Sequence, residues 1–509
     1  MLNLQNSFRK SDSFFRAIPS RSLMIMKFQV SSAQLYLDPT RWSRFLWHAA
    51  LVRRISHYSS LPGTCDATRS LIQGVFRQNG ETPILPLLHT FEWSANIPVR
   101  DDAFIMLFSP SLLCATLKFL GSHDEAEIVR LIRRLRVSSP SLEKLAVFMG
   151  YHRHMLGLGP ARELVEFSRL HEIHVSTIQT PATFRAIVAM PNLTSLECQC
   201  TVDEITGSSV ELGRVISVPD LCQLTVRGRE SAFQSLFSLH LFPALQSATF
   251  SIDAPPPSQG RAQMDIATFL ALFYNSIPNS KFLQSFNLYV GSRSQKMPQS
   301  GPQPSLREVL APILSNCSLR SFRLTTMDKL VSLNDADICA LAAAWPGLKA
   351  LHLAVPPSPT PESNISISAI HHLHTHCRRL AELSIPTLRW PLIGVHSIPS
   401  PPSALDSPPV HPLWRLYMPP QDITAELLPL FGVELSDEAA EAMARYLLDL
   451  FPLMGSELNA WVYKEMVNEA RDEQDPSVIY LRPPRVRLDD RWSRVAQHIL
   501  SIKSASNEP

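Results

Sequence analysis

The densest group of possible metal ligands in the chain lies between residues 371 and 377. The group comprises His371, His372, His374, His376 and Cys377. On a helix, His372 and His376 would lie four residues apart on one face, a spacing that can chelate zinc. No carboxylate occurs within the group, and Ile370 and Leu373 place an apolar stripe beside it. We interpret the segment as a helix with histidines on its outer face, with metal binding as the alternative.

Sequence motifs for nucleophilic, metal-assisted or nucleotide-dependent catalysis are missing. The chain contains no G-x-S-x-G, no H-E-x-x-H, no Walker A pattern and no dinucleotide-binding glycine pattern. The paired acids Asp101–Asp102 and Asp489–Asp490 are adjacent, so on regular structure their side chains point apart. We therefore predict a protein that is not an enzyme, with no catalytic residue, no metal and no cofactor.

Four arginines follow one another at helical spacing, and such a run can bind phosphate. They are Arg130, Arg133, Arg134 and Arg136. The first three share the polar face of a helix whose apolar face carries Leu131 and Leu135. We interpret the run as a solvated helix face, with phosphate binding as the alternative.

A short apolar pattern, L-x-x-L-x-L in its ideal form, recurs along most of the chain. It indicates the secondary-structure elements that carry the histidines and arginines described above. Clear copies begin at Leu88, Leu112, Leu142, Leu170, Leu193, Leu221, Leu245, Leu283, Leu319, Leu348 and Leu380, with a weaker one at Val52–Ile55. Their spacing runs from 23 to 38 residues. The last two apolar positions are two residues apart, as on one face of a strand. A period of this kind is the signature of leucine-rich repeats.

Between these copies the apolar period becomes helical. Ile128, Leu131, Ile132 and Leu135 show it, and so do the segments 266–273 and 338–345. Prolines such as Pro191 and Pro346 stand where a helix would end before the next strand. Strand-helix-strand connections are right-handed in nearly all proteins. The sequence therefore predicts an α/β fold: a right-handed leucine-rich-repeat solenoid with a concave parallel sheet and helices on its convex side.

Composition shifts divide the chain into five expected segments. Residues 1–37 form an N-terminal tail, of which residues 1–28 are either a basic targeting peptide or an irregular start. Residues 38–395 form the irregular solenoid, and 396–420 a Pro-rich linker. Residues 421–468 form a C-terminal helical capping unit, and 469–509 a charged tail that frays.

The overall composition indicates which classes of partner and which cellular compartment to expect. The 509 residues carry a formal net charge of +2 and are 45% hydrophobic. Such a balance provides no field that would gather nucleic acid or an anionic membrane. The eight cysteines are scattered, which indicates buried thiols in a reducing compartment and hence a cytoplasmic or nuclear protein.

The residue between the second and third apolar positions of each copy should point to the concave side. Along the array this strip is polar, mixed in charge and poor in lysine. We expect it to bind a protein or a peptide, although a plain solvent-exposed sheet would look the same. The candidate partner-binding residues, two of which lie slightly further along their strands, are Glu92, His174, Glu197, Arg227, Tyr289, Arg323 and His352.

Two segments with the repeat pattern, 190–196 and 345–353, resemble the F-box/leucine-rich-repeat proteins of mushroom-forming fungi. The stretches 41–46 and 52–55 look like the junction that follows the F-box there, and the resemblance covers residues 38–465. It implies a substrate-recognition subunit of an SCF-type ubiquitin ligase. In that family the F-box docks on a Skp-type linker bound to a cullin, and the repeats present the substrate.

The sequence departs from that family in two respects. An F-box pattern, a Leu-Pro start followed by apolar residues at helical spacing, is not visible in residues 1–40. The asparagine that usually follows the third apolar position occurs only as Asn96. The first departure favours the alternative, a stand-alone repeat protein without a ligase role. The second predicts that the turns are held in another way.

Overall fold

The computed structural model describes most of the repeat region and parts of both terminal regions. The described residues are 16–17, 24–25, 39–59, 72–95, 103–119, 124–149, 156–178, 180–200, 215–253, 266–291, 303–326, 330–356, 365–386, 411–413, 415–417, 436–454 and 490–506. The chain divides into two compact units, residues 1–245 and 246–509, called unit 1 and unit 2.

Unit 1 contains a parallel sheet whose strands follow one another in chain order. The strands are β3 (Arg54–Ser59), β4 (Thr90–Ala95), β5 (Cys114–Phe119), β6 (Lys144–Met149), β7 (Glu172–Ile178), β8 (Ser195–Cys200) and β10 (Gln223–Gly228). Its helices are α1 (Pro39–Ala49), η2 (Ala103–Leu107), α3 (Glu125–Ser138), α4 (Leu158–Val165), α5 (Pro181–Val188) and α6 (Glu230–Leu239). Two small pairs complete it, β1 (Arg16–Ala17) with β2 (Met24–Ile25) and β9 (Ile216–Ser217) with β11 (His240–Leu241).

Unit 2 repeats this arrangement with longer connections. Its parallel strands are β12 (Ser247–Asp253), β13 (Ser285–Gly291), β14 (Ser321–Thr326), β15 (Ala350–Ala354), β16 (Glu382–Ser384) and β17 (Arg415–Tyr417). Its helices are α7 (Ile266–Asn275), η4 (Ser280–Phe282), α8 (Leu306–Leu314), α9 (Asp335–Ala344), α10 (Ile367–His376), α12 (Asp437–Leu450) and α14 (Asp490–Ser506).

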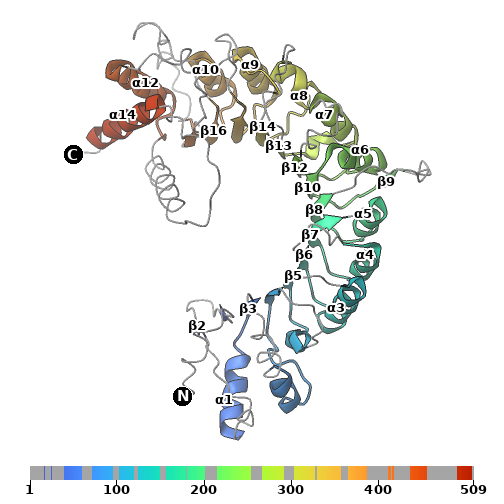
Figure 1. The fold of residues 1–509 in the computed structure, drawn as a ribbon. Coiled ribbons are helices and arrows are strands. Elements are labelled where there is room, and N and C mark those ends of the chain that lie inside the picture. Colours follow the sequence, from blue (N-terminus) through green and yellow to red (C-terminus); the bar gives the residue numbers. More distant parts are fainter. Residues whose placement is uncertain are drawn as a thin grey trace, which may run out of the picture. The chain divides into compact units, whose positions relative to one another are not determined.

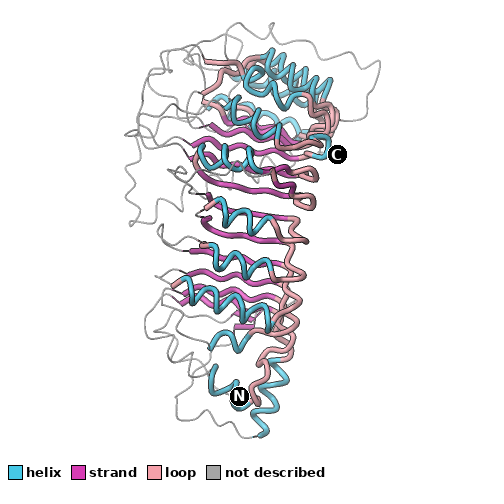
Figure 2. The backbone as a smooth tube through the Cα atoms, turned by 90° about the vertical axis from the view of Figure 1, so that its right-hand side faces the viewer, coloured by secondary structure: helices cyan, strands magenta, loops and turns pink. Residues whose placement is uncertain are grey.

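Each unit consists of two layers, a sheet and a row of helices. In each unit the strands lie on the inner side of the curve and the helices on its outer side (Figure 1). Viewed from the side, the strands run parallel to one another with the helices stacked along one face of the sheet (Figure 2). The predicted fold class, an α/β leucine-rich-repeat solenoid, is confirmed.

The apolar positions of the repeat pattern form the core between these layers. Leu112, Leu142 and Leu221 are 0% exposed, and strands such as β5 alternate between buried and half-buried side chains. On the helix side of the core, α3, α7 and α9 bury the apolar residues that their helical period predicted. Each strand and helix therefore buries one face against its neighbours, as stacked repeats must.

Backbone hydrogen bonds hold the turns that lead into the strands. The Leu113 carbonyl accepts two N–H donors of the next repeat, Glu143 at 2.8 Å and Lys144 at 3.0 Å. Other carbonyls accept pairs of donors in the same way. In unit 1 they belong to Arg53, His89, Glu143, His171 and Thr194, and in unit 2 to Gln246, Gln284, Arg320 and Lys349. This ladder of double acceptors provides partners for the N–H groups from the backbone itself, in place of the asparagine side chain that most of the copies lack.

Carboxylates join the starts of neighbouring helices in unit 2. Asp337 accepts the backbone N–H of Asn334 at the start of its own helix and, at 2.9 Å, that of Arg307 in α8. Asp335 accepts the N–H of Ser366, the N-cap of α10, at 2.6 Å. Burial raises the pKa of Asp337, which is 1% exposed, and the two backbone donors oppose that rise. Helix capping therefore also links one repeat to the next.

Two elements near the C-terminus were missed by the sequence analysis. Strand β17 extends the sheet of unit 2 within the segment that we expected to be a linker. Helix α14 lies within the expected tail and buries Val495, Ala496 and Ile499, while α12 occupies the expected capping unit. The proposed boundaries between the five segments stay a prediction.

Candidate protein-binding surfaces

The sheet of unit 1 presents its outward side chains in aligned rows, called here the unit 1 face. The strand register aligns the middle row as Ser56, Glu92, Thr116, Ala146, His174, Glu197 and Thr225. A second row, two residues earlier on each strand, contains Arg54, Thr90, Cys114, Lys144, Glu172, Ser195 and Gln223. A third row, two residues later, includes Lys118, Phe148, Gln199 and Arg227. Parallel pairing therefore places side chains from distant repeats next to one another.

Glu92 is fixed at the N-terminal end of this face. Its carboxylate is paired with the Arg54 guanidinium and accepts a hydrogen bond from the Ser56 hydroxyl at 2.8 Å. The Glu92 side chain is only 21% exposed. A carboxylate held by two neighbours is preorganised, because its rotamer is already fixed before any partner arrives.

The centre of the unit 1 face is apolar and has charged surroundings. The Phe148 ring meets the His174 ring edge-on at 4.4 Å, and the Lys118 ammonium lies 5.5 Å from its centroid. Beside it, Lys144 forms an ion pair with Glu172 at 2.7 Å. Ala146 lies between Lys144 and Phe148 on β6. An apolar centre inside a polar ring is the usual arrangement of an interface hot spot.

His174 and Glu197, two predicted residues of this face, lie in contact. Nε2 of His174 lies 3.3 Å from a Glu197 oxygen. The two groups form an ion pair only when the imidazole is protonated. Burial lowers the pKa of His174, although Glu197 and Glu172 act in the opposite direction. The imidazole is therefore neutral at neutral pH, and the Glu197 side chain beside it is 51% exposed.

The sheet of unit 2 presents a second surface, called here the unit 2 face. Its middle row contains Thr249, Asn287, Arg323, His352 and Ser384, and the preceding row begins with Ser247, Ser285 and Ser321. The Arg323 guanidinium donates to the Tyr289 hydroxyl at 3.0 Å, and the Asn287 amide donates to the Thr249 hydroxyl at 3.0 Å. Nε2 of His352 lies 3.4 Å from a Glu382 oxygen. Hydroxyls and amides thus dominate this face.

The seven predicted residues all lie on these two faces. Unit 1 carries Glu92, His174, Glu197 and Arg227, and unit 2 carries Tyr289, Arg323 and His352. The structure brings together His174 with Glu197 and Tyr289 with Arg323. Five further residues of these faces were not predicted: Arg54, Lys144, Glu172, Phe148 and Glu382. Each of these lies two residues from the middle row, so the period of a strand would have identified them.

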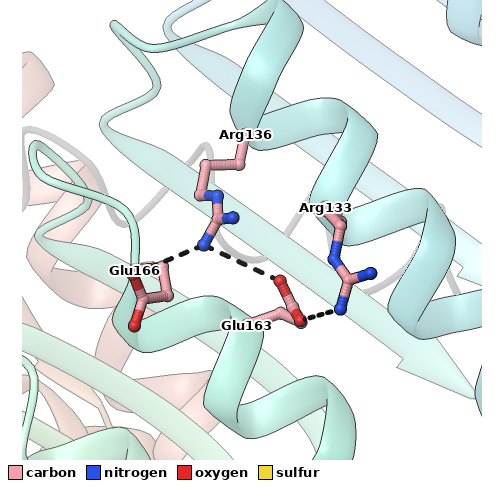
Figure 3. Close-up of polar contacts among 4 residues, drawn as sticks. All are labelled: Arg133, Arg136, Glu163 and Glu166. Atoms are coloured by element: carbon pink, nitrogen blue, oxygen red, sulfur yellow. Dashed lines mark hydrogen bonds and ion pairs between the residues drawn. The ribbon is translucent and has the colours of Figure 1, made fainter.

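Two arginines of α3, Arg133 and Arg136, pair with carboxylates on and just after α4, as Figure 3 shows. Arg133 lies 2.6 Å from Glu163 on α4, and Arg136 lies 3.7 Å from Glu163 and 3.6 Å from Glu166. The hydrogen bond from Arg133 lowers the pKa of Glu163. These contacts favour the interpretation of a solvated helix face, because the guanidinium groups of Arg133 and Arg136 are already engaged by carboxylates.

The histidine-rich segment forms α10, as its spacing predicted. The Nδ1–H of His376 donates to the carbonyl of His372 at 3.0 Å, and the rings of His371 and His374 are 6.4 Å apart. Within the described ranges, no three or more His, Cys, Asp or Glu side chains are placed to hold a metal ion. No helix in the same ranges has both the length and the apolar character needed to cross a membrane.

Comparisons with known proteins show no family for this chain. No protein-family model and no curated protein matches the chain. A crystal structure of a protein from Bacteroides fragilis is similar, with 13% identity and a TM-score of 0.28, and covers 53% of this chain and 69% of its own. The leucine-rich repeat domain of the type III effector XopL is similar, with 14% identity and a TM-score of 0.23, and covers 77% and 98%. The fold of this chain is that of a leucine-rich-repeat protein.

Proposed function

We propose that the chain is an interaction scaffold that binds a folded protein or a peptide on its sheet faces and performs no chemistry itself. The observation that carries this proposal is the register of the strands, which aligns polar side chains from successive repeats into continuous rows. Side chains on neighbouring strands are held by their pairing, so a partner meets a preformed surface and loses little free energy in ordering it.

The charge pattern favours a protein partner. On the unit 1 face, basic side chains alternate with Glu92, Glu172 and Glu197, and the basic residues Arg54 and Lys144 are paired with carboxylates. A nucleic acid would need a continuous basic stripe to displace its counterions. A surface with both signs instead selects a partner with complementary charges in register.

The finer proposal is a substrate-recognition subunit of an SCF-type ubiquitin ligase, located in the cytoplasm or the nucleus. It rests on the resemblance of residues 38–465 to F-box/leucine-rich-repeat proteins. The second candidate is a stand-alone leucine-rich-repeat binding protein, which is favoured by the missing F-box pattern in residues 1–40. Purification of the native protein should distinguish them, because only the first requires a Skp-type linker and a cullin to co-purify.

Site-specific photo-crosslinking in cells tests the binding surface. A photoreactive residue at Glu197 or Arg323 should form adducts with a partner, whereas one at Val137, 74% exposed on α3, should not. The variant Lys144→Glu, which brings a like charge beside Glu172, should remove the adduct at Glu197. Equal adducts at Val137, or adducts indifferent to Lys144→Glu, would contradict binding on the unit 1 face.

A further inference from the structure

A small cluster of rings joins α12 to α10. The cluster, called here the ring cluster, comprises His374, His411 and Phe451. The two imidazoles stack, with centroids 5.0 Å apart and 27° between their planes. The Phe451 ring meets both edge-on, at 5.4 Å from His374 and 4.9 Å from His411. Because Phe451 is the C-cap of α12, these contacts attach the C-terminal helices to the repeat that contains α10.

His411 is held as a neutral imidazole by two hydrogen bonds. Its Nδ1 accepts the backbone N–H of Leu413 at 3.2 Å, and its Nε2–H donates to the Cys377 carbonyl at 3.1 Å. A proton on Nδ1 would remove the acceptor and break the first bond. Burial, followed by the positive charge of His374, lowers the pKa of His411 to about 4, although the hydrogen bond to the Cys377 carbonyl acts in the opposite direction.

His374 also favours its neutral form. Burial lowers its pKa, and the positive charges of His371 and Arg378 act in the same direction, while a hydrogen bond to the Leu450 carbonyl opposes them. The neighbouring Cys377 thiol stays uncharged, since burial raises its pKa to about 12. Within the described ranges, the groups that act on the two rings are therefore neutral or cationic. An imidazolium formed here would meet no carboxylate among them.

We propose that the ring cluster is an acid-sensitive latch, which holds α12 and α14 on the repeat array and releases them when its imidazoles take up protons. Release would uncover the Phe451 ring, 0% exposed, which packs on both imidazoles. The end of the array would then carry apolar surface in place of its helical cap, a change that favours association of open chains. This inference is independent of the proposed function.

The direction of the effect follows from proton linkage. Released imidazoles have pKa values near 6.5, whereas the docked His411 has a pKa of about 4. The released form therefore binds more protons between these two values, so acid favours opening. From His411 alone, the opening equilibrium constant should rise about 20-fold between pH 7 and pH 5. His374 adds to this rise because its pKa is also lowered.

Hydrogen exchange of the full chain, read by mass spectrometry at pH 7 and pH 5 and corrected for intrinsic rates, tests the latch. We expect the opening constant of the amides in α12 to rise by about 20-fold or more. The opening constant of the amides in α8, in the same unit, should stay unchanged. A change in α12 below about threefold, or an equal change in α8, would overturn the proposal.

Two variants assign the effect to the imidazoles. His374→Gln with His411→Gln keeps a donor and an acceptor at each position but removes both titrating rings. The pH dependence of α12 should disappear in this double variant. His376→Gln, on the exposed side of α10, is the matched control and should keep the wild-type ratio. Full dependence in the double variant, or its loss in His376→Gln, would overturn the latch.

Discussion

Unit 1 and unit 2 share one architecture but fill it with different side chains. On strands β6 to β10, the buried side chains of unit 1 are aliphatic or sulfur-containing, such as Val147, Val175 and Cys198, and the buried rings there come from the segments between the strands, such as Phe184 and Phe233. In unit 2, a continuous chain of rings runs from Phe250 through Phe286 and Phe322 to Trp345, with centroids 4.9 to 6.1 Å apart. The repeat pattern therefore determines which positions carry apolar side chains, but not whether these side chains are aliphatic or aromatic.

The two sheet faces also differ, in the kind of polar contact that their side chains make. The unit 1 face contains ion pairs, among them Lys144 with Glu172, around an aromatic centre. The unit 2 face contains an amide–hydroxyl hydrogen bond, Asn287–Thr249, and a bond from the Arg323 guanidinium to the uncharged Tyr289 hydroxyl, while His352 lies beside Glu382. Unit 1 should thus interact with partners in a salt-dependent manner and unit 2 much less so. The following predictions test this contrast, starting with the largest effect.

The aromatic chain should make unit 2 the more sensitive to truncation in the core. Phe286→Ala removes contacts with Phe250, Phe273 and Phe322 and should lower the free energy of unfolding by about 3–5 kcal/mol. A truncation in the core of unit 1, Val175→Ala, should cost about 2 kcal/mol because fewer atoms leave the core. Hydrogen exchange of each unit gives both values, and equal costs would contradict the contrast between the cores.

The carboxylate that joins α8 to α9 should be the next most sensitive feature. Asp337→Ala leaves the N–H groups of Arg307 and Asn334 without their acceptor and should cost about 2 kcal/mol. Loss of protection should appear at the starts of both helices. The control Asp437→Ala, at the exposed start of α12, should change stability by less than about 0.5 kcal/mol. A loss confined to α9 would disprove the link between repeats.

The Tyr289 hydroxyl tests the neutral character of the unit 2 face. Tyr289→Phe removes the acceptor of Arg323 and should cost about 0.5–1 kcal/mol. Because one partner is uncharged, this cost should change little between low and high salt. Chemical denaturation at two salt concentrations measures it, and a cost that vanishes in salt would mean that charge governs this face too.

The exposed ion pair of unit 1 should contribute least to stability. Lys144 and Glu172 are 48% and 43% exposed, so Lys144→Ala should cost at most about 0.5 kcal/mol. Screening should abolish even this cost at high salt, in contrast to Tyr289→Phe. A cost above about 1 kcal/mol that persists in salt would show that the pair is structural and not a free element of the binding surface.

Most of the repeat frame could be predicted from the sequence because its signal is periodic. Leu196 and Cys198, two residues apart after Pro191, located β8, and the helical spacing of Ile338 and Leu341 located α9. Strand β17 was missed because it is three residues long and follows a Pro-rich stretch. Helix α14 was missed because it is mostly polar and buries its apolar side chains against a helix far away in sequence.

The candidate surface could be predicted in part. The middle row follows from the strand pattern alone, so Glu197 and Arg323 were identified. The contacts that shape the surface, such as Phe148 with His174 or Arg54 with Glu92, depend on strand register and on the neighbouring row. The neutral state of His174 depends on burial, which no spacing reveals.

The ladder of carbonyl double acceptors has a consequence for how such a chain can change over evolution. Each strand is positioned by a carbonyl of the repeat before it, for example Arg320 and Ser321 by Gln284. Loops can then lengthen or shorten freely, as copies spaced from 23 to 38 residues apart illustrate. New sequence grafted between two repeats should leave the neighbouring strands in place, which makes the array tolerant of insertion.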